Sequence, residues 1–199
     1  YCLSSALPIE IDEIKRAKEF LAKSYGSLYN LSPHLSLSTV PVPQYNQSKC
    51  AHAVSEYFSN KKSFVVKFSR LSLDRNKNFF YLDVESPQLF QIHKEITAIT
   101  NQFRDGCIRE KDFVRLNSGY YSDEEAENIN KYGFAHSMLR YQPHITIGNV
   151  LSTKLGDEIQ KAQVTLNTLL SPIFDKKVII RKVIVHYHSD AVNQSDIEV

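Results

Sequence analysis

The chain is poor in the residues that build several common kinds of protein site. It has no Trp, one Met, three Cys and six scattered Gly among its 199 residues. The cysteines (Cys2, Cys50 and Cys107) are odd in number and widely spaced, which fits neither a disulfide framework nor a zinc site. We therefore expect reduced thiols in the cytoplasm. The chain starts at Tyr1 rather than Met, so an N-terminal targeting segment stays open.

Several motifs of nucleotide and acyl chemistry are also absent. The sequence has no Gly-x-x-x-x-Gly-Lys phosphate loop, no Gly-x-Gly-x-x-Gly turn and no Gly-x-Ser-x-Gly elbow for an acyl-enzyme. It lacks a Lys-x-Asp-Gly site for a covalent nucleotidyl-lysine, which argues against an ATP-driven ligase. No apolar run is long enough to span a membrane. The net charge of +2 does not demand a nucleic-acid partner, but it leaves room for a local basic groove.

The chain does contain an octapeptide pattern that occurs twice. Residues 33–40 read Pro-His-Leu-Ser-Leu-Ser-Thr-Val, and residues 143–150 read Pro-His-Ile-Thr-Ile-Gly-Asn-Val. Seven His and seven Pro in 199 residues give about a quarter of one Pro-His step by chance (7 × 7/199). Two copies of the longer pattern therefore indicate a repeat with a structural or chemical role.

Both copies have the alternation of a half-buried β-strand, in which successive side chains point to opposite faces. The apolar face carries Leu35, Leu37, Ile145 and Ile147. The polar face carries an imidazole and a hydroxyl in each copy, His34 with Ser36 and His144 with Thr146. If the two copies meet across one cleft, one imidazole can take a proton while the other gives one. The hydroxyls can then hold the oxygens of a tetrahedral group.

This pair of motifs resembles the signature of the 2H phosphoesterase superfamily, which includes the bacterial 2′-5′ RNA ligase-like proteins and the cyclic phosphodiesterases. The residues that carry the resemblance are His34-Leu35-Ser36 and His144-Ile145-Thr146. Members that trim RNA 3′ ends have His-x-Ser motifs like the first one, whereas the second motif here has Thr. The alternative from the residues themselves is two buried strands that each carry a hydrogen-bonded His.

The remaining pattern predicts an α+β fold with mainly antiparallel sheets. A period of two predicts strands at 1–8, 33–40, 63–70, 79–84, 143–150 and 178–188, and a helical period predicts helices at 10–25, 47–58, 86–103 and 152–170. The resemblance implies two pseudo-symmetric sheets, backed by helices, around a central groove. We therefore expect one bilobal domain over residues 1–199.

Residues 104–142 form an insert that is too long for a plain connection, which favours a functional lid or an inserted hairpin. Ser122 to Glu125 has the form of a capping box, so a short helix should follow. Basic residues and tyrosines are interleaved in the insert. This suits a phosphodiester flanked by bases, and it equally suits a solvated loop with packed rings. Arg140 and Tyr141 lie just before the second motif and Tyr45 follows the first, so these three are the candidate substrate contacts.

We expect a metal-independent phosphodiesterase that hydrolyses a 2′,3′-cyclic phosphate or a related RNA or nucleotide phosphodiester. His34 and His144 would be the catalytic acid and base in either order, and Ser36 and Thr146 would bind the phosphoryl oxygens. We expect no cofactor and no metal. The substrate would be an RNA end, an oligonucleotide or a cyclic nucleotide, and the protein would be a monomer that does not engage a membrane.

Two other functions stay open at this point. One is a nucleotide- or RNA-binding module without turnover. The other is a histidine-ligated metallohydrolase, since His186 and His188 lie on one face of a strand and could join His34, His144 or Asp190. The plainer interpretation of this pair is two solvated imidazoles at a strand end. The remaining histidines, His52, His93 and His136, are expected to be structural or exposed.

Overall fold

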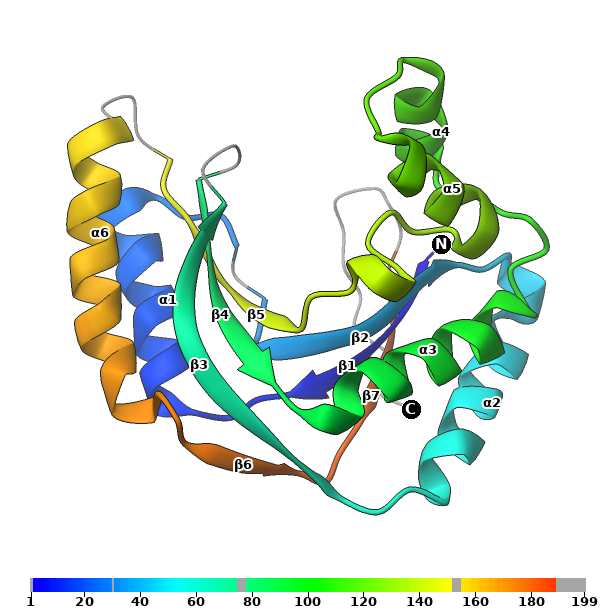
Figure 1. Ribbon diagram of the computed structural model, residues 1–199, viewed down its shortest axis with the longest axis horizontal. Coiled ribbons are helices and arrows are strands. Elements are labelled where there is room, and N and C mark those ends of the chain that lie inside the picture. The colour runs from blue at the N-terminus through cyan, green and yellow to red at the C-terminus, as the bar shows by residue number, and fades with distance from the viewer. Residues whose placement is uncertain (1, 30, 75–77, 152–154, 189–199) are drawn as a thin grey trace.

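The computed structural model describes residues 2–29, 31–74, 78–151 and 155–188 (Figure 1). Its strands are β1 (Cys2–Pro8), β2 (His34–Pro41), β3 (Phe64–Asp74), β4 (Phe79–Glu85), β5 (His144–Asn149), β6 (Lys177–Ile180) and β7 (Ile184–His188). Its α-helices are α1 (Asp12–Tyr25), α2 (Gln47–Ser59), α3 (Pro87–Asn101), α4 (Glu110–Asn117), α5 (Asp123–Tyr132) and α6 (Leu155–Leu170). Short 3-10 helices are η1 (Gln44–Asn46), η2 (Met138–Arg140) and η3 (Ser171–Ile173).

The strands form one curled sheet in the order β6-β3-β4-β5-β2-β1-β7 (Figure 1). The strand pairs that build it are antiparallel. The two motif strands, β2 and β5, are neighbours near its middle and pair at Leu35 and Ile145. The predicted α+β class is confirmed. The two expected sheets are the two halves of this single sheet, which the β2–β5 pair joins.

The helices cover the sheet in two groups and give the molecule its two lobes. In Figure 1, α1 and α6 lie on the left against β5 and β3, and α2 and α3 lie on the right against β1 and β2. Helix α1 therefore follows β1 along the chain but packs on the opposite half of the sheet. One continuous hydrophobic cluster runs through both lobes and includes Leu35 and Ile145 at their junction.

The sequence of α1 explains its buried face and its end. Ile14, Ala17 and Leu21 recur at helical spacing and are fully buried. Gly26 follows in the left-handed conformation with φ of 68°, and its N–H donates to the carbonyl of Leu21. Glycine suits this position because it has no Cβ to clash. The helix ends where the sequence predicted and begins at Asp12, two residues after the predicted start.

The β-rich run predicted at 178–188 is two strands and not one. Strand β6 pairs with β3 at one edge of the sheet, and β7 pairs with β1 at the other edge. Residues 181–183 connect them, and such a short link spans at most about 14 Å. The two edges must therefore approach each other, which requires the sheet to curl. The strand-like alternation of the sequence cannot reveal this break, because both strands have the same alternation.

The insert at 104–142 is mostly helical, with α4, α5 and η2 projecting from the β2 lobe (Figure 1). The predicted capping box at Ser122 and Glu125 is confirmed at the start of α5. Buried Arg104 donates to the carbonyls of Cys107 and Asn130, both at 2.7 Å. Gly133 ends α5 with φ of 78°, and a Cβ there would lie 2.5 Å from the ring of Pro41. The insert is therefore packed directly on the end of β2.

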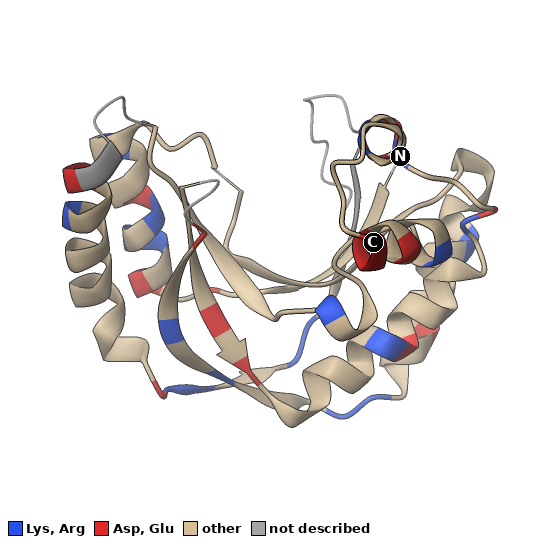
Figure 2. Ribbon diagram, turned by 45° about the horizontal axis from the view of Figure 1, so that its top comes forward, with Lys and Arg blue, Asp and Glu red and all other residues tan. Residues whose placement is uncertain are grey.

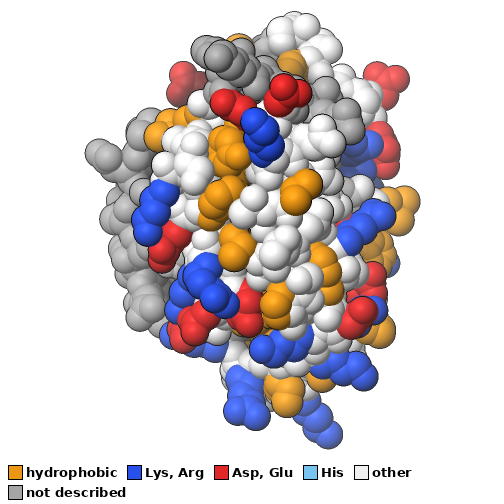
Figure 3. Space-filling view, turned by 90° about the vertical axis from the view of Figure 1, so that its left-hand side faces the viewer, with side chains coloured by type: hydrophobic (Ala, Val, Ile, Leu, Met, Phe, Trp, Pro, Cys, Tyr) orange, Lys and Arg blue, Asp and Glu red, His pale blue; other side chains and the backbone are white. Residues whose placement is uncertain are grey.

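The outer surface carries charges of both signs. Figure 3 faces the lobe of α1 and α6, where basic, acidic and apolar side chains are mixed. Across the described ranges, every helix is too short or too polar to pass through a lipid bilayer. The three cysteines all lie in the described ranges and form no disulfide. Burial raises the pKa of the Cys50 thiol to about 12, which disfavours the reactive thiolate.

Candidate active site

The two His-x-Ser/Thr motifs lie side by side in the middle of the sheet. Leu35 pairs with Ile145, so the antiparallel register places His34 opposite Thr146 and Ser36 opposite His144. The flanking Leu35, Leu37, Ile145 and Ile147 are all fully buried. The motif imidazoles and hydroxyls therefore share the opposite face of the sheet. His34 and His144 are diagonal neighbours on the two strands, so their Cα atoms are roughly 7–8 Å apart.

Both imidazoles are held in the same way by the backbone. Nδ1 of His34 lies 2.8 Å from the carbonyl oxygen of Ser32, and Nδ1 of His144 lies 2.7 Å from that of Gln142. A carbonyl can only accept, so Nδ1 carries the hydrogen in each ring and Nε2 carries the lone pair of the neutral form. Each ring is thus oriented for proton transfer at Nε2.

The prolines between these residues have a role that sequence reasoning missed. Pro33 and Pro143 each separate a motif histidine from the carbonyl that its ring binds. Proline fixes its own φ and holds the residue before it in an extended conformation. This keeps the carbonyls of Ser32 and Gln142 in place. The sequence predicts only that the Pro-His step starts a strand, whereas the structure shows that it also orients the imidazole.

A row of aromatic rings lies beside His144 on the same face of the sheet, and it too was not predicted. Tyr81 on β4 pairs with Thr146 in the sheet, and its ring lies edge-on to His144 with centroids 4.6 Å apart. Phe79 stacks on Tyr81 at 6.1 Å, and Tyr29 packs edge-on to Phe79 at 6.1 Å. Burial raises the pKa of the Tyr81 hydroxyl to about 12, so this group stays neutral. The alternation of β4 could have predicted this row from the sequence, because Phe79 and Tyr81 face away from buried Phe80 and Leu82.

The ammonium group of a buried lysine contacts the backbone of the second motif. Lys18 on α1 is 9% exposed, and its Nζ lies 3.3–3.4 Å from the carbonyls of Tyr29, Thr146 and Ile147. The same Nζ lies 4.3 Å from the centre of the Tyr29 ring. Burial lowers the pKa of Lys18 to about 8. Sequence reasoning placed this residue on a helix and gave it no role.

The insert is tied to the first motif strand through His93 and Tyr141. His93 on α3 is 2% exposed, donates from Nδ1 to the carbonyl of Leu37 at 2.6 Å, and accepts at Nε2 from the N–H of Met138 at 2.9 Å. Its ring stacks on that of Tyr141 with centroids 4.0 Å apart and 3° between planes. The Tyr141 hydroxyl donates to the carbonyl of Ser36 at 2.9 Å. His93 is thus structural, as expected, and Tyr141 lies directly beside the site.

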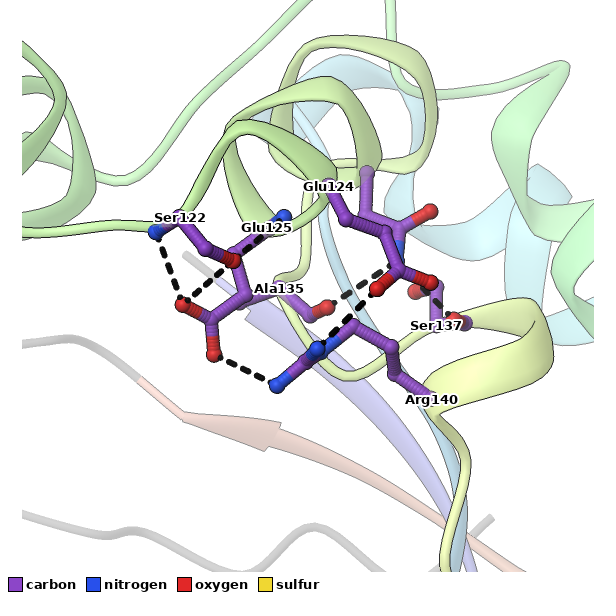
Figure 4. Close-up of polar contacts among 7 residues, drawn as sticks. Ser122, Glu124, Glu125, Ala135, Ser137 and Arg140 are labelled. Atoms are coloured by element: carbon purple, nitrogen blue, oxygen red, sulfur yellow. Dashed lines mark hydrogen bonds and ion pairs between the residues drawn. The ribbon is translucent and has the colours of Figure 1, made fainter.

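The structure places the other two candidate substrate contacts elsewhere. Arg140 forms ion pairs with Glu124 at 3.1 Å and Glu125 at 3.0 Å, which bind η2 to the start of α5 (Figure 4). Tyr45 in η1 is 71% exposed, and its hydroxyl donates to Asp105. Their part in substrate binding stays a prediction. The acidic partners of Arg140 lie 15 and 16 residues earlier in the chain, beyond the reach of local pattern reasoning.

The structure also bears on whether the histidines could bind a metal ion. Among the side chains that the structure describes, no group of three or more His, Cys, Asp or Glu could hold a metal ion. The backbone of His186 and His188 belongs to β7, but their side chains and Asp190 lie outside the described ones. The metal alternative therefore stays a prediction as well.

A sheet with two neighbouring His-x-Ser/Thr strands, backed by two pairs of helices, defines the class of 2H phosphoesterase folds. The chain belongs to the 2'-5' RNA ligase superfamily, whose family model matches residues 4–173. This membership supports an enzyme of the phosphoesterase type. No curated protein sequence matches the chain significantly.

Solved structures show the same fold at low sequence identity. TT0787 of Thermus thermophilus is 11% identical with a TM-score of 0.58, over 94% of this chain and 88% of that one. A structure described as a phosphoesterase is 10% identical with a TM-score of 0.58, over 98% and 94%. E. coli LigT complexed with phosphate is 10% identical with a TM-score of 0.54, over 98% and 93%. The chain therefore spans nearly the whole length of these proteins.

Proposed function

We propose that the protein is a metal-independent phosphodiesterase that hydrolyses a ribose 2′,3′-cyclic phosphate or a related RNA or nucleotide phosphodiester. The observation that carries the proposal is the matched anchoring of His34 and His144. Two imidazoles on adjacent strands, each with Nδ1 bound to a carbonyl two residues earlier, present two equivalent proton-transfer groups on one face of the sheet. The phosphate in the E. coli LigT structure supports a phosphoryl substrate here.

The reaction follows from these positions. One imidazole takes a proton from water as the water oxygen attacks phosphorus. The bond from phosphorus to one ribose oxygen breaks, and the other imidazole gives that oxygen a proton, leaving a phosphomonoester and a hydroxyl. Ser36 and Thr146, each opposite the histidine of the other motif, donate hydrogen bonds to the non-bridging oxygens as their charge grows. The balance requires water and no other reactant.

The aromatic row is the natural place for the base of the substrate. Tyr81 lies next to His144, and Phe79 and Tyr29 continue the row from it. Aromatic rings bind nucleic-acid bases by stacking. Tyr141 supports the backbone of Ser36 from the other side. The two alternatives from sequence are a binding module without turnover and a metallohydrolase. They differ from the proposal in whether a product forms and whether its formation needs metal.

One assay distinguishes the phosphodiesterase, the binding module without turnover and the metallohydrolase. The protein is incubated with 2′,3′-cyclic nucleotides and cyclic-phosphate-ended RNA in excess EDTA, and the product end groups are identified. We expect turnover that survives chelation, and loss of turnover in His34→Ala and His144→Ala. His52→Ala, on the exposed side of α2, is the matched control. Binding without product would favour the binding module, and activity restored by zinc or manganese would favour the metallohydrolase.

A further inference from the structure

The strands on one side of the motif pair carry charged side chains. The central strands β2 and β5 contain no Lys, Arg, Asp or Glu, whereas β3 and β4 carry both signs (Figure 2). Asp83 on β4 is the direct cross-strand partner of His144. Paired side chains in a sheet share one face, so the Asp83 carboxylate lies on the same face of the sheet as His144 and beside it.

Asp83 holds Arg70 on this face. Nε of Arg70 lies 2.9 Å from Oδ2 of Asp83, and the hydroxyl of Ser72 donates to the same oxygen at 2.6 Å. The register of β3 shifts between Phe68 and Leu71, so two residues, Ser69 and Arg70, lie opposite Asp83. The Asp83 side chain is 29% exposed, while that of Arg70 is 79% exposed. The carboxylate thus fixes one nitrogen of a guanidinium that is otherwise exposed to solvent.

The guanidinium of Arg70 differs from the ammonium of Lys67 in how fully its N–H donors are bound. Lys67, on the same strand, is bound by Glu85 at 3.2 Å and Asp175 at 3.1 Å. Arg70 uses Nε for Asp83, and within the described part of the chain its two terminal nitrogens make no hydrogen bond. A guanidinium held in this way presents a fork of N–H groups, which is the geometry that binds phosphate bidentately.

The position suits a phosphate next to the reactive one. Adjacent strands are about 4.8 Å apart, and Arg70 reaches back from β3 over β4 to the carboxylate beside His144. The guanidinium therefore lies about one strand spacing from the histidine strand. This is close enough to bind a neighbouring phosphodiester of the same nucleotide strand, and it is offset from the space between His34 and His144.

We propose that Arg70, held by Asp83, is a second phosphate-binding residue. It binds the phosphodiester on the 5′ side of the reactive phosphate, so the preferred substrate is an RNA end of at least two nucleotides and not a lone cyclic nucleotide. This inference rests on the proposed function, because it takes the reactive phosphate to lie between His34 and His144.

The test compares a 2′,3′-cyclic mononucleotide with a dinucleotide that ends in a 2′,3′-cyclic phosphate. The wild-type protein should prefer the dinucleotide in kcat/KM. Arg70→Gln should lower the ratio of the two kcat/KM values about tenfold, the size expected for one charge-assisted bond to phosphate in a partly solvated site. Arg16→Gln, an equal loss of charge on the exposed face of α1, should leave the ratio as it is. Equal losses on both substrates, or no loss, would overturn the proposal.

A binding arm keeps the subsite testable without turnover. Calorimetry compares a dinucleotide bearing a terminal 3′-phosphate with the 3′-mononucleotide at several salt concentrations. Arg70→Gln should remove most of the advantage of the dinucleotide, and it should reduce the slope of log affinity against log salt by about 0.7. A wild-type protein that binds both ligands equally contradicts the subsite. If Arg70 governs binding but neither cyclic phosphate is hydrolysed, the proposed function fails while the subsite stands.

Discussion

At the scale of the residue, the site combines two imidazoles that differ in sequence position and match in geometry. The carbonyls of Ser32 and Gln142 fix Nδ1 in both rings. Each histidine is also opposite the hydroxyl of the other motif, so the four side chains form two cross-strand pairs. In the proposed reaction the histidines move protons and the hydroxyls bind oxygens, so replacing them should have effects of different size.

Replacing His34 or His144 by Ala should lower kcat by about two to four orders of magnitude, the range for a positioned acid or base. Ser36→Ala and Thr146→Ala should each cost about one to three orders, because each removes a single donor to the phosphoryl oxygens. The double histidine variant should lose far less than the product of the two single losses, since the pair acts as a unit. Steady-state kinetics on a cyclic nucleotide measures all five variants.

Thermal denaturation provides the control for these variants. The four substitutions leave Leu35 and Ile145 in the core, so the melting temperature should change little. Fully active, folded proteins carrying either His→Ala change would show that the two motifs are structural strands.

Lys18 is a second residue with a measurable signature. Its pKa falls from 10.5 in the unfolded chain to about 8 in the folded protein because it is buried. Between these two values the unfolded chain binds more protons, so the free energy of unfolding rises with pH across this window. A shift of this size corresponds to roughly 3 kcal/mol. Denaturant unfolding at pH 7.5 and pH 10 should show the rise in the wild type and its absence in Lys18→Met.

Lys15→Met is the matched control, because Lys15 lies on the same helix and is exposed. Tyrosines and other lysines titrate alike in all three proteins, so the comparison isolates Lys18. An identical pH dependence in Lys18→Met and the wild type would mean that the ammonium is better solvated than its position indicates.

At the scale of the element, the insert depends on α3 for its position. His93 links the carbonyl of Leu37 on β2 to the N–H of Met138 in η2, and Tyr141 stacks on its ring. Burial lowers the pKa of His93, while its bond to Leu37 opposes the shift. The neutral ring accepts from Met138, so protonation removes this acceptor. The contribution to stability is complete above the unfolded value of 6.5 and is lost as the pH falls through the lowered pKa.

His93→Phe keeps an aromatic ring beside Tyr141 and removes both hydrogen bonds. A buried donor or acceptor left unpaired costs about 1–3 kcal/mol, and two are left here, so the docking of the insert should weaken by roughly 2–6 kcal/mol. Hydrogen exchange should show lower protection factors across residues 104–142. The wild type should lose further protection at acidic pH, and this loss should be absent in the variant.

The same change at an exposed histidine, His52→Phe on α2, should leave the protection of the insert as it is. Unaltered protection factors in His93→Phe would show instead that the contacts of Arg104 and Gly133 hold the insert without help from α3.

At the scale of the whole molecule, two lobes share one sheet and one core. The β2–β5 pair joins the halves of the sheet, and the hydrophobic cluster continues across it. A chain with one continuous core unfolds as a unit, so we expect a single calorimetric transition with equal van't Hoff and calorimetric enthalpies. Two separate transitions would show that the lobes are independent folding units.

Leu35→Ala tests the junction, because Leu35 is fully buried where the lobes meet. Removing these methyl groups should destabilise the protein by about 2–5 kcal/mol and keep the transition single. Leu28→Ala is the matched control. Leu28 is 79% exposed, and its replacement should change the stability by no more than about 0.5 kcal/mol.

Sequence reasoning placed most elements within a few residues, because helix and strand periods report on neighbours along the chain. It identified the motif strands, the buried and polar faces of each, and the capping box at Ser122. It did not find the split of the last β-rich run, the full set of helices in the insert, or the acidic partners of Arg140. Each of these depends on segments that meet only after folding.

Local sequence was enough to predict which face of each motif strand the imidazoles and hydroxyls occupy, since alternation on a strand is a local property of the backbone. The tertiary structure decided that the two strands are neighbours with Leu35 opposite Ile145, although 110 residues separate them. It also placed Tyr81 and the Asp83–Arg70 pair beside His144. Strand pairing and register come from hydrogen bonds and core packing between distant segments, and no local pattern encodes them.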